Sequence, residues 1–306
     1  MKKQRLILGL AAILGISVLT SCENEDDNNT MKAVADMSIA EYAVSDNNFS
    51  TLVKALTKAN LVSVLSAEGS FTVFAPTNAA FEALFMDLGI SSIDQLTSEQ
   101  LSPILLYHVL GSEVKSSMIT EGYVATLSPA QSSYLNLNIS LNGGVNLNKN
   151  TKVTAADVDV KNGVIHVIDK VLLPPTVVDH ALANDNFSIL VSAVVKAGLV
   201  ETLMGNGPFT IFAPTNAAFE ALFTQLGISG IADLTAEQLI PILKYHVVSG
   251  NVRSTSLTAG SVSTLNGNID VTLSPKPAIN TTTMIIATDV QASNGVIHVI
   301  DKVLLP

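Results

Sequence analysis

The octapeptide Phe-Ala-Pro-Thr-Asn-Ala-Ala-Phe occupies residues 74–81 and recurs without a change at residues 212–219. The offset between the two copies is 212 − 74 = 138 residues, and the same offset relates the Tyr-His-Val of residues 107–109 to that of residues 245–247. A repeat period this long indicates tandem domains, because the units of solenoid repeats are far shorter. The chain therefore contains two copies of one module.

A second block closes each copy and sets the boundary between them. Residues 162–174 read Asn-Gly-Val-Ile-His-Val-Ile-Asp-Lys-Val-Leu-Leu-Pro and return unchanged at residues 294–306, at an offset of 294 − 162 = 132. The second copy is therefore 138 − 132 = 6 residues shorter between its blocks. We expect one domain over residues 36–174 and another over residues 175–306, with a short, stiff boundary at the Pro174-Pro175 pair.

Apolar residues at helical spacing predict two helices in the first copy. They recur at i, i+3, i+4 and i+7 over residues 49–56 and again over residues 81–88. Thr77 is suited to cap the start of the second helix, and Gly89 to end it. The octapeptide therefore marks a strand-to-helix corner, in which a proline fixes φ and a threonine caps the helix.

The remaining pattern places strands after helices. Capping boxes at residues 97–100 and 235–238 predict a further helix in each copy, which an internal proline should kink or shorten. Later segments alternate apolar and polar residues, as strands do. Asn162-Gly163 lies between two such segments and predicts a hairpin with a type I′ turn, whose two central residues need positive φ. Helices followed by strands indicate an α+β fold.

Composition narrows the function classes. The chain has 306 residues, a formal net charge of −10 and a single cysteine. A protein with a net negative charge and no cluster of basic residues is not expected to bind nucleic acid. One cysteine excludes an internal disulfide and a cysteine-rich metal site.

The N-terminus has the form of a targeting segment. Residues 1–21 combine a basic start, an apolar run and a small-residue end, which predicts a secretory signal peptide. The chain's one cysteine, Cys22, follows directly, and Leu-Thr-Ser-Cys resembles the bacterial lipobox, in which this cysteine is lipidated. The alternative is an ordinary signal peptide that leaves Cys22 free. Residues 22–35 are polar and acidic at first, and predict a flexible tether.

The tether also bears on localisation. Its acidic stretch is similar to the surface-export signals of Bacteroidetes lipoproteins, so we expect an outer-membrane lipoprotein displayed at the cell surface. The alternative is a solvated spacer that leaves the protein on the periplasmic face.

Three motifs occur in the same order in both copies and carry a family resemblance. In the first copy they are residues 72–81, the Tyr-His pair at residues 107–108, and residues 162–169. These blocks resemble the hallmark motifs of the FAS1 (fasciclin, or beta-Ig-h3) domain family. The resemblance implies that each copy is a β-wedge or sandwich flanked by helices. It also implies a role in cell adhesion and extracellular-matrix interaction.

The resemblance, the expected anchor and the lack of catalytic motifs favour the first of two hypotheses about function. The first is a lipid-anchored extracellular or cell-surface adhesion protein that binds a protein or polysaccharide partner. The alternative is a periplasmic or surface accessory lipoprotein that binds a glycan or a small molecule. The family's tyrosine–histidine motif is associated with integrin binding in animal members. We therefore expect partner-binding residues on the exposed surface around Tyr107, His108, Tyr245 and His246.

The repeated histidines and carboxylates are expected to have structural roles and not catalytic ones. The repeated histidines lie in apolar surroundings, the repeated carboxylates stand singly, and the fifth histidine, His180, aligns with Tyr42, which indicates packing. No zinc motif, nucleophile elbow or phosphate loop is present. We therefore expect no enzyme, no catalytic residue, no metal and no cofactor. The motif positions to which we assign structural roles are Pro76, Thr77, His166, Asp169, Pro214, Thr215, His298 and Asp301.

Overall fold

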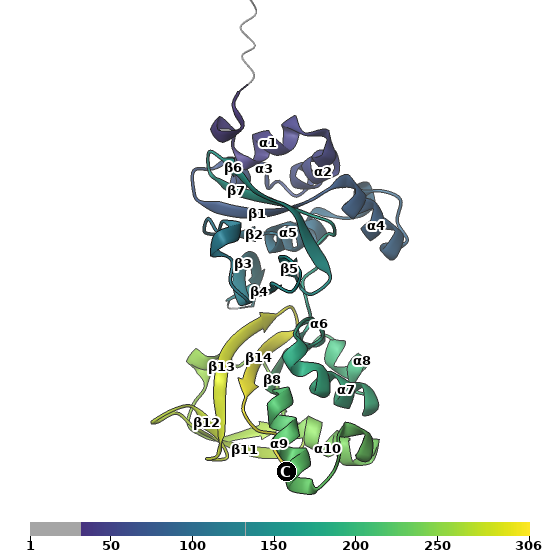
Figure 1. Cartoon of the computed structure of the whole chain (residues 1–306), viewed down its shortest axis with the longest axis vertical. Coiled ribbons are helices and arrows are strands. Elements are labelled where there is room, and N and C mark those ends of the chain that lie inside the picture. The colour runs from purple at the N-terminus through teal and green to yellow at the C-terminus, as the bar shows by residue number, and fades with distance from the viewer. Residues whose placement is uncertain (1–31, 132) are drawn as a thin grey trace, which may run out of the picture. The chain divides into compact units, whose positions relative to one another are not determined.

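The computed structural model of the chain describes residues 32–131 and 133–306 (Figure 1). The expected signal peptide, Cys22 and most of the expected tether lie outside these residues. The last two tether residues, 34 and 35, belong to the 3-10 helix η1 (Val34–Asp36), whose side chains are not buried. Within the described residues, no helix is both long enough and apolar enough to cross a membrane.

The first copy begins with helices and ends with strands, as expected for an α+β fold. Its helices are α1 (Ile39–Ser45), α2 (Ser50–Lys58), α3 (Val62–Ser66), α4 (Asn78–Leu88) and α5 (Ser98–Tyr107). Its strands are β1 (Phe71–Pro76), β2 (Val109–Leu110), β3 (Gly122–Ala130), β4 (Ser133–Ser140), β5 (Asn146–Leu147), β6 (Thr151–Val160) and β7 (Gly163–Ile168). Short 3-10 turns are η2 (Asn47–Phe49), η3 (Ile93–Gln95) and η4 (Ser116–Met118).

The second copy repeats this order. Its helices are α6 (Val177–Ala183), α7 (Ser188–Lys196), α8 (Val200–Met204), α9 (Asn216–Leu226) and α10 (Ala236–Tyr245). Its strands are β8 (Phe209–Pro214), β9 (Val247–Ser249), β10 (Gly260–Thr264), β11 (Gly267–Thr272), β12 (Ala278–Ile279), β13 (Thr283–Ala292) and β14 (Gly295–Ile300). Its 3-10 turns are η5 (Asp185–Phe187), η6 (Ile231–Asp233) and η7 (Ser254–Ser256).

Each copy builds one seven-stranded mixed sheet. The strand order is β2-β1-β7-β6-β5-β4-β3 in the first copy, and β9-β8-β14-β13-β12-β11-β10 repeats it in the second. Strands β1 and β7 are parallel, with Phe71 opposite Gly163 and Pro76 opposite Ile168, whereas the other pairs are antiparallel. The parallel pair joins the two sequence motifs that lie furthest apart within a copy.

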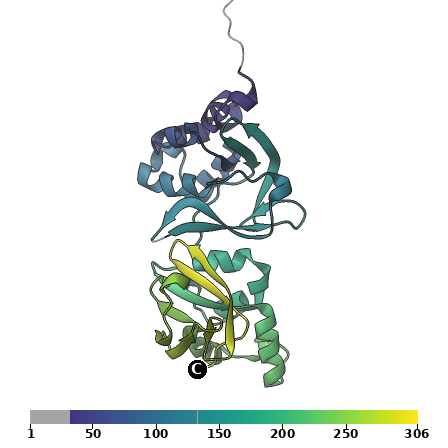
Figure 2. The ribbon, with the colours of Figure 1, turned by 90° about the vertical axis from the view of Figure 1, so that its left-hand side faces the viewer.

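The sheet separates two apolar cores in each copy. Alternate residues of β1 face opposite sides, so Val73 packs in the core under the helices and Phe74 packs in the core enclosed by the sheet. In Figure 2 the purple and blue helices of the first copy gather on one side of its strands. A sheet wrapped around its own core, with helices against it, matches the expected β-wedge.

The local helix signals are confirmed. Thr77 accepts a hydrogen bond from the N–H of Ala80 at 3.3 Å, and Gly89 ends α4 with φ of 66°. Both expected capping boxes form, with Thr97 and Gln100 in the first copy. The expected shortening is wrong, because α5 continues beyond Pro103 to Tyr107.

The Asn-Gly hairpin forms, but the reason expected for it is wrong. Strands β6 and β7 are antiparallel, with Val160 opposite Gly163, so the two turn residues are Lys161 and Asn162. Gly163 is instead the first residue of β7, where an added Cβ would lie 2.0 Å from the carbonyl oxygen of Phe71. A glycine is therefore needed at this position because β1 passes close to its backbone, and not because of a type I′ turn.

The two copies also contact each other within residues 33–306. The N–H of Gln291 in β13 donates to the side-chain oxygen of Asn136 in β4 at 2.8 Å. The rings of Tyr123 and His180 meet edge to face, with centroids 5.4 Å apart. His180 is fully buried, as its alignment with an aromatic residue indicated.

Candidate functional site

The tyrosine–histidine motif lies at the end of α5 and is buried. Tyr107 is 0% exposed and His108 is 2% exposed, with 7% and 2% for Tyr245 and His246. We expected partner-binding residues on the exposed surface around this motif, and the four motif side chains themselves do not lie on that surface. Sequence alone does not reveal that the end of α5 points into the core enclosed by the sheet.

Hydrogen bonds explain why a tyrosine is needed at this buried position. The Tyr107 hydroxyl donates to the carbonyl oxygen of Asn136 at 2.8 Å and accepts from the side-chain amide of Asn148 at 3.0 Å. Burial raises the pKa of Tyr107 above its ordinary value. The neutral hydroxyl thus ties α5 to strand β4 and to the turn between β5 and β6. Tyr245 repeats both bonds in the second copy.

The neighbouring histidine ties the same helix to the end of its copy. Nδ1 of His108 lies 2.8 Å from the carbonyl oxygen of Ile104, and Nε2 accepts from the N–H of Leu172 at 2.9 Å. Accepting at Nε2 places the proton on Nδ1, which donates to Ile104. Burial lowers the pKa of His108 to about 4, so the ring is neutral at pH 7. His246 repeats the arrangement with Ile242 and Leu304.

Each histidine of the second pair joins a strand of the sheet to the loop that precedes the 3-10 turn η4 or η7. Nδ1 of His166 accepts from the N–H of Asp157 at 3.2 Å, and Nε2 donates to the carbonyl oxygen of Val114 at 2.9 Å. His298 makes the same bonds to Asp289 and Val252. Burial lowers the pKa of His298. Both nitrogens of each ring are therefore occupied by main-chain atoms.

Ser116, Asp157 and His166 lie together, as the members of a hydrolytic triad would. Asp157 accepts from the N–H of Ser116 at 2.8 Å and from its hydroxyl, and these bonds lower the pKa of Asp157. The histidine, however, contacts the peptide N–H of Asp157 and not the serine hydroxyl. A triad needs a histidine that takes the proton of the nucleophile. This geometry lacks that contact.

The other motif residues also serve the backbone. Asp169 accepts from the N–H of Lys152 at 2.7 Å, and Asp301 accepts from that of Met284 at the same distance. Pro76 ends β1 and Thr77 caps α4; Pro214 and Thr215 do the same for β8 and α9. Within residues 32–131 and 133–306, no group of three or more histidine, cysteine, aspartate or glutamate residues could hold a metal ion.

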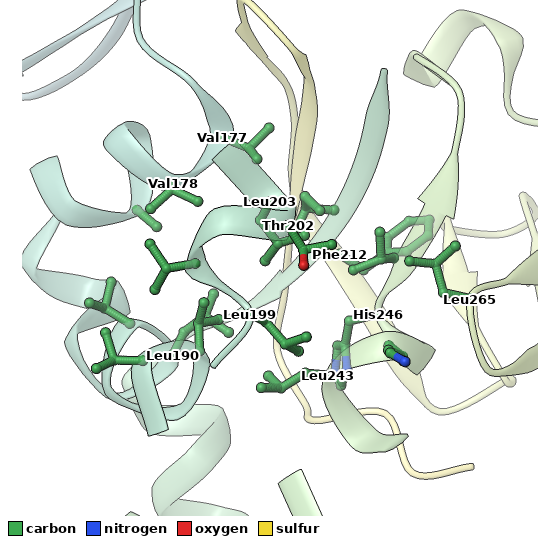
Figure 3. Close-up of a pocket in the computed structure, with 18 of the residues that line it drawn as sticks. Val177, Val178, Leu190, Leu199, Thr202, Leu203, Phe212, Leu243, His246 and Leu265 are labelled. Atoms are coloured by element: carbon green, nitrogen blue, oxygen red, sulfur yellow. The ribbon is translucent and has the colours of Figure 1, made fainter. Parts of the chain in front are cut away.

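The structure adds a feature that the sequence analysis missed, an apolar pocket in the second copy (Figure 3). Its volume is about 120 Å³, and most of its lining is aliphatic, with side chains from α6, α7, α8 and α10 around β8. The matching space in the first copy measures only about 20 Å³. The available signal was the set of positions where the two copies differ, such as Leu56 against Val194 and Leu106 against Lys244.

Comparison with known proteins places both copies in one family. The sequence model described as "Fasciclin domain" matches residues 47–174 and residues 185–306. "Protein sll1483" of Synechocystis is 46% identical over 134 residues, which are 43% of this chain and 73% of that protein.

The names of two further relatives refer to induction by a growth factor and to the cell surface. "Transforming growth factor-beta-induced protein ig-h3" of Sus scrofa is 33% identical over 273 residues, 86% of this chain and 37% of that protein. "Cell surface glycolipoprotein MPB83" of Mycobacterium bovis is 32% identical over 162 residues, 51% of this chain and 69% of that protein. The chain thus spans little more than a third of the ig-h3 protein.

One solved structure is also similar to this chain. It is a FAS1 domain pair from the insect cell adhesion molecule Fasciclin I, with 19% sequence identity and a TM-score of 0.49. The match covers 87% of this chain and 96% of that one.

Proposed function

The chain belongs to the fasciclin domain family, and from this premise we propose that it is a lipid-anchored adhesion protein at the cell surface. Its partner would be an extracellular protein or polysaccharide. The observation that carries the proposal is that both copies are fasciclin domains, at residues 47–174 and 185–306. The chain thus presents two related surfaces in tandem, and two linked weak contacts give higher avidity than either alone.

The anchor and the surface location have separate support. Residues 1–21 have the pattern of a secretory signal, and the lone Cys22 stands where a lipobox places the lipidated cysteine. One relative that matches half of this chain is called a cell surface glycolipoprotein. A lipid at Cys22 and a polar stretch after it would hold the two domains at a membrane while leaving them free to reach a partner.

The bonding of the motif residues supports a binding role without catalysis. The conspicuous polar side chains, such as His108 and His166, are engaged by backbone groups. Partner binding would then use exposed surface outside the motifs. Tyr107 and His108 would act indirectly, by fixing the end of the helix α5.

The anchor and its location can be tested in intact cells that produce the full chain. We expect metabolic labelling with a fatty acid to mark the protein, and external protease to degrade it without lysis. The matched variant Cys22→Ser should lose the label and leave the membrane fraction while keeping the fold. A wild-type chain that carries no label, or that resists protease until the cells are lysed, would contradict this part of the proposal.

Adhesion itself needs a separate measurement. Cells that lack the protein should attach less to surfaces coated with matrix proteins or polysaccharides, and the Cys22→Ser variant should not restore attachment. The purified full chain should bind at least one component of such an array. Unchanged attachment together with an array that shows no binding would refute the adhesive role.

A further inference from the structure

The apolar pocket of the second copy lies between its helices and its sheet. Figure 3 shows Val177 and Val178 of α6, Leu203 of α8 and Leu243 of α10 around one space, with Phe212 of β8 beside them. An apolar cavity of about 150 Å³ in another protein stays dry and takes up a benzene molecule. A pocket of about 120 Å³ therefore holds only part of a hydrocarbon chain, and the rest of a longer tail would lie along its exposed apolar rim.

In the first copy, larger side chains fill most of the corresponding space. At the 138-residue offset, Ile39 stands where the second copy has Val177, and Leu56 stands where it has Val194. Each of these replacements removes one methylene from the lining, and the matching space in the first copy is only about 20 Å³. The pocket thus arises from side chains that differ between otherwise similar modules.

A third replacement takes an aromatic ring out of the lining. Tyr42 lines the small space in the first copy, whereas its counterpart His180 does not line the pocket of the second. His180 Nε2 instead donates to the carbonyl oxygen of Gln291 at 3.2 Å, and the ring contacts Tyr123. The tyrosine ring that lines the space of the first copy therefore has no counterpart in the lining of the second.

Apart from the exposed Thr202 and Lys244, the one polar side chain among the described residues that line the pocket is the buried His246. His246 lines it, but one ring nitrogen bonds the carbonyl of Ile242 and the other accepts from the N–H of Leu304. Because a buried polar group needs a partner, a ligand must place only hydrocarbon there. The pocket selects an apolar tail.

The rim carries apolar side chains and one cation. Leu182 is 48% exposed, Val195 is 61% exposed and Leu265 is 43% exposed, so the lining reaches the surface. Lys244 also lines the pocket, is exposed, and has no ion-pair partner among the described residues. The first copy has Leu106 at this position. The positive charge is thus particular to the copy that has the open pocket.

We propose that this pocket binds a medium-chain fatty acid, with the tail among the aliphatic side chains and the carboxylate at Lys244. The apolar lining recognises the tail through burial of its hydrocarbon surface. The ammonium group of Lys244 recognises the head group through a charge-assisted hydrogen bond. The first copy, with a filled space and a leucine at the rim, binds no such ligand.

Decanoate is a suitable probe, and decanol is its uncharged counterpart. Calorimetric titration of the full chain with decanoate at pH 7, below the micellar concentration, should give saturable binding of one molecule per chain. Lys244→Leu should weaken decanoate binding about fivefold to tenfold and leave decanol binding unchanged. Lys276→Leu, a change at an exposed lysine that does not line the pocket, should alter neither.

A second variant tests the tail. Val177→Ile combined with Val194→Leu gives the pocket the side chains that the first copy already accommodates, and it should weaken binding of both probes at least tenfold. Urea unfolding verifies that this variant folds. The proposal is overturned if the wild type shows no saturable decanoate binding, if filling the pocket leaves binding unchanged, or if Lys244→Leu weakens both probes equally. The Lys244 test alters only an exposed side chain, so it stands even if the filled variant does not fold.

Discussion

The side-chain oxygen of Asn162 accepts a hydrogen bond from the N–H of Ile39 at 2.9 Å, across 123 residues of chain. The amide nitrogen of the same side chain donates to the carbonyl oxygens of Leu65 and Ala67, at 2.9 and 2.8 Å. One buried amide in the β6–β7 turn thereby ties down the start of α1 and the end of α3. Asn294 repeats all three bonds in the second copy.

Replacing this asparagine should destabilise its copy strongly. Asn162→Ala leaves one donor and two acceptors without partners in a buried place, and each orphaned group costs about 1–3 kcal/mol. We expect urea unfolding to show a loss of about 2–4 kcal/mol. The control Asn142→Ala changes an exposed side chain and should stay within about 0.5 kcal/mol of the wild type. Equal stability of the two variants would contradict the role of Asn162.

The glycine that follows should tolerate no side chain. In Gly163→Ala the new Cβ would meet the Phe71 carbonyl oxygen at 2.0 Å, so β1 and β7 would have to separate. We expect a loss of about 3 kcal/mol or more, or a first copy that does not fold. Gly230→Ala is the control, since its Cβ would meet nothing within 4 Å. Thermal unfolding distinguishes the two, and a normal melting temperature for Gly163→Ala would be evidence against the close approach.

The tyrosine motif should affect stability more than partner binding. Tyr107→Phe removes the hydroxyl that bonds Asn136 and Asn148, and should lower the free energy of unfolding by about 1–3 kcal/mol. Since the side chain is buried, binding of the folded variant to any partner found on the array should change less than twofold. A large loss of partner binding by a fully folded Tyr107→Phe protein would instead indicate that Tyr107 contacts the partner directly.

Stability should decrease as the pH falls from about 6.5 to about 4. Burial lowers the pKa of His108, His180 and His246 from the usual 6.5 to about 4. In this window the unfolded chain binds protons that the folded chain does not, so acid favours unfolding. Each histidine contributes a loss of about 2 kcal/mol between pH 7 and pH 5.

Urea titrations at several pH values measure this dependence. Replacing His108 and His246 by glutamine removes two of the four histidines whose pKa burial lowers, so the variant should be less stable at pH 7 but should lose less stability on acidification. If the double variant showed the same pH dependence as the wild type, the histidines would not be its cause.

Local signals allowed the helices to be predicted, because caps act within one turn. Thr77 and Gly89 delimit α4 through contacts that span at most five residues. The role of Asn162 could not be predicted in this way. The Asn-Gly pair indicated a turn, whereas its purpose depends on Ile39 and Phe71, which lie far away along the chain.

The candidate binding site was harder to predict for a related reason. In the sequence, Tyr107 looked like part of a surface recognition motif. Only the position of Asn136 in the folded sheet shows that the Tyr107 hydroxyl has its hydrogen-bond partner inside the protein. The pocket depends on small volume differences at positions that are apolar in both copies, such as Leu56 and Val194. A pattern of apolar residues in the sequence does not show whether their side chains fill the space between the helices and the sheet.

The parallel pairing of β1 with β7 has a consequence for how the chain reaches its native state. Strands β7 and β14 have identical sequences, and both pair in the same register with partners that differ at a single residue, Val73 against Ile211. An exchange of β7 and β14 between the copies would therefore form equivalent hydrogen bonds, a misassembly to which repeat proteins are prone. Synthesis order favours correct pairing, because the first copy can close before the ribosome has delivered β14.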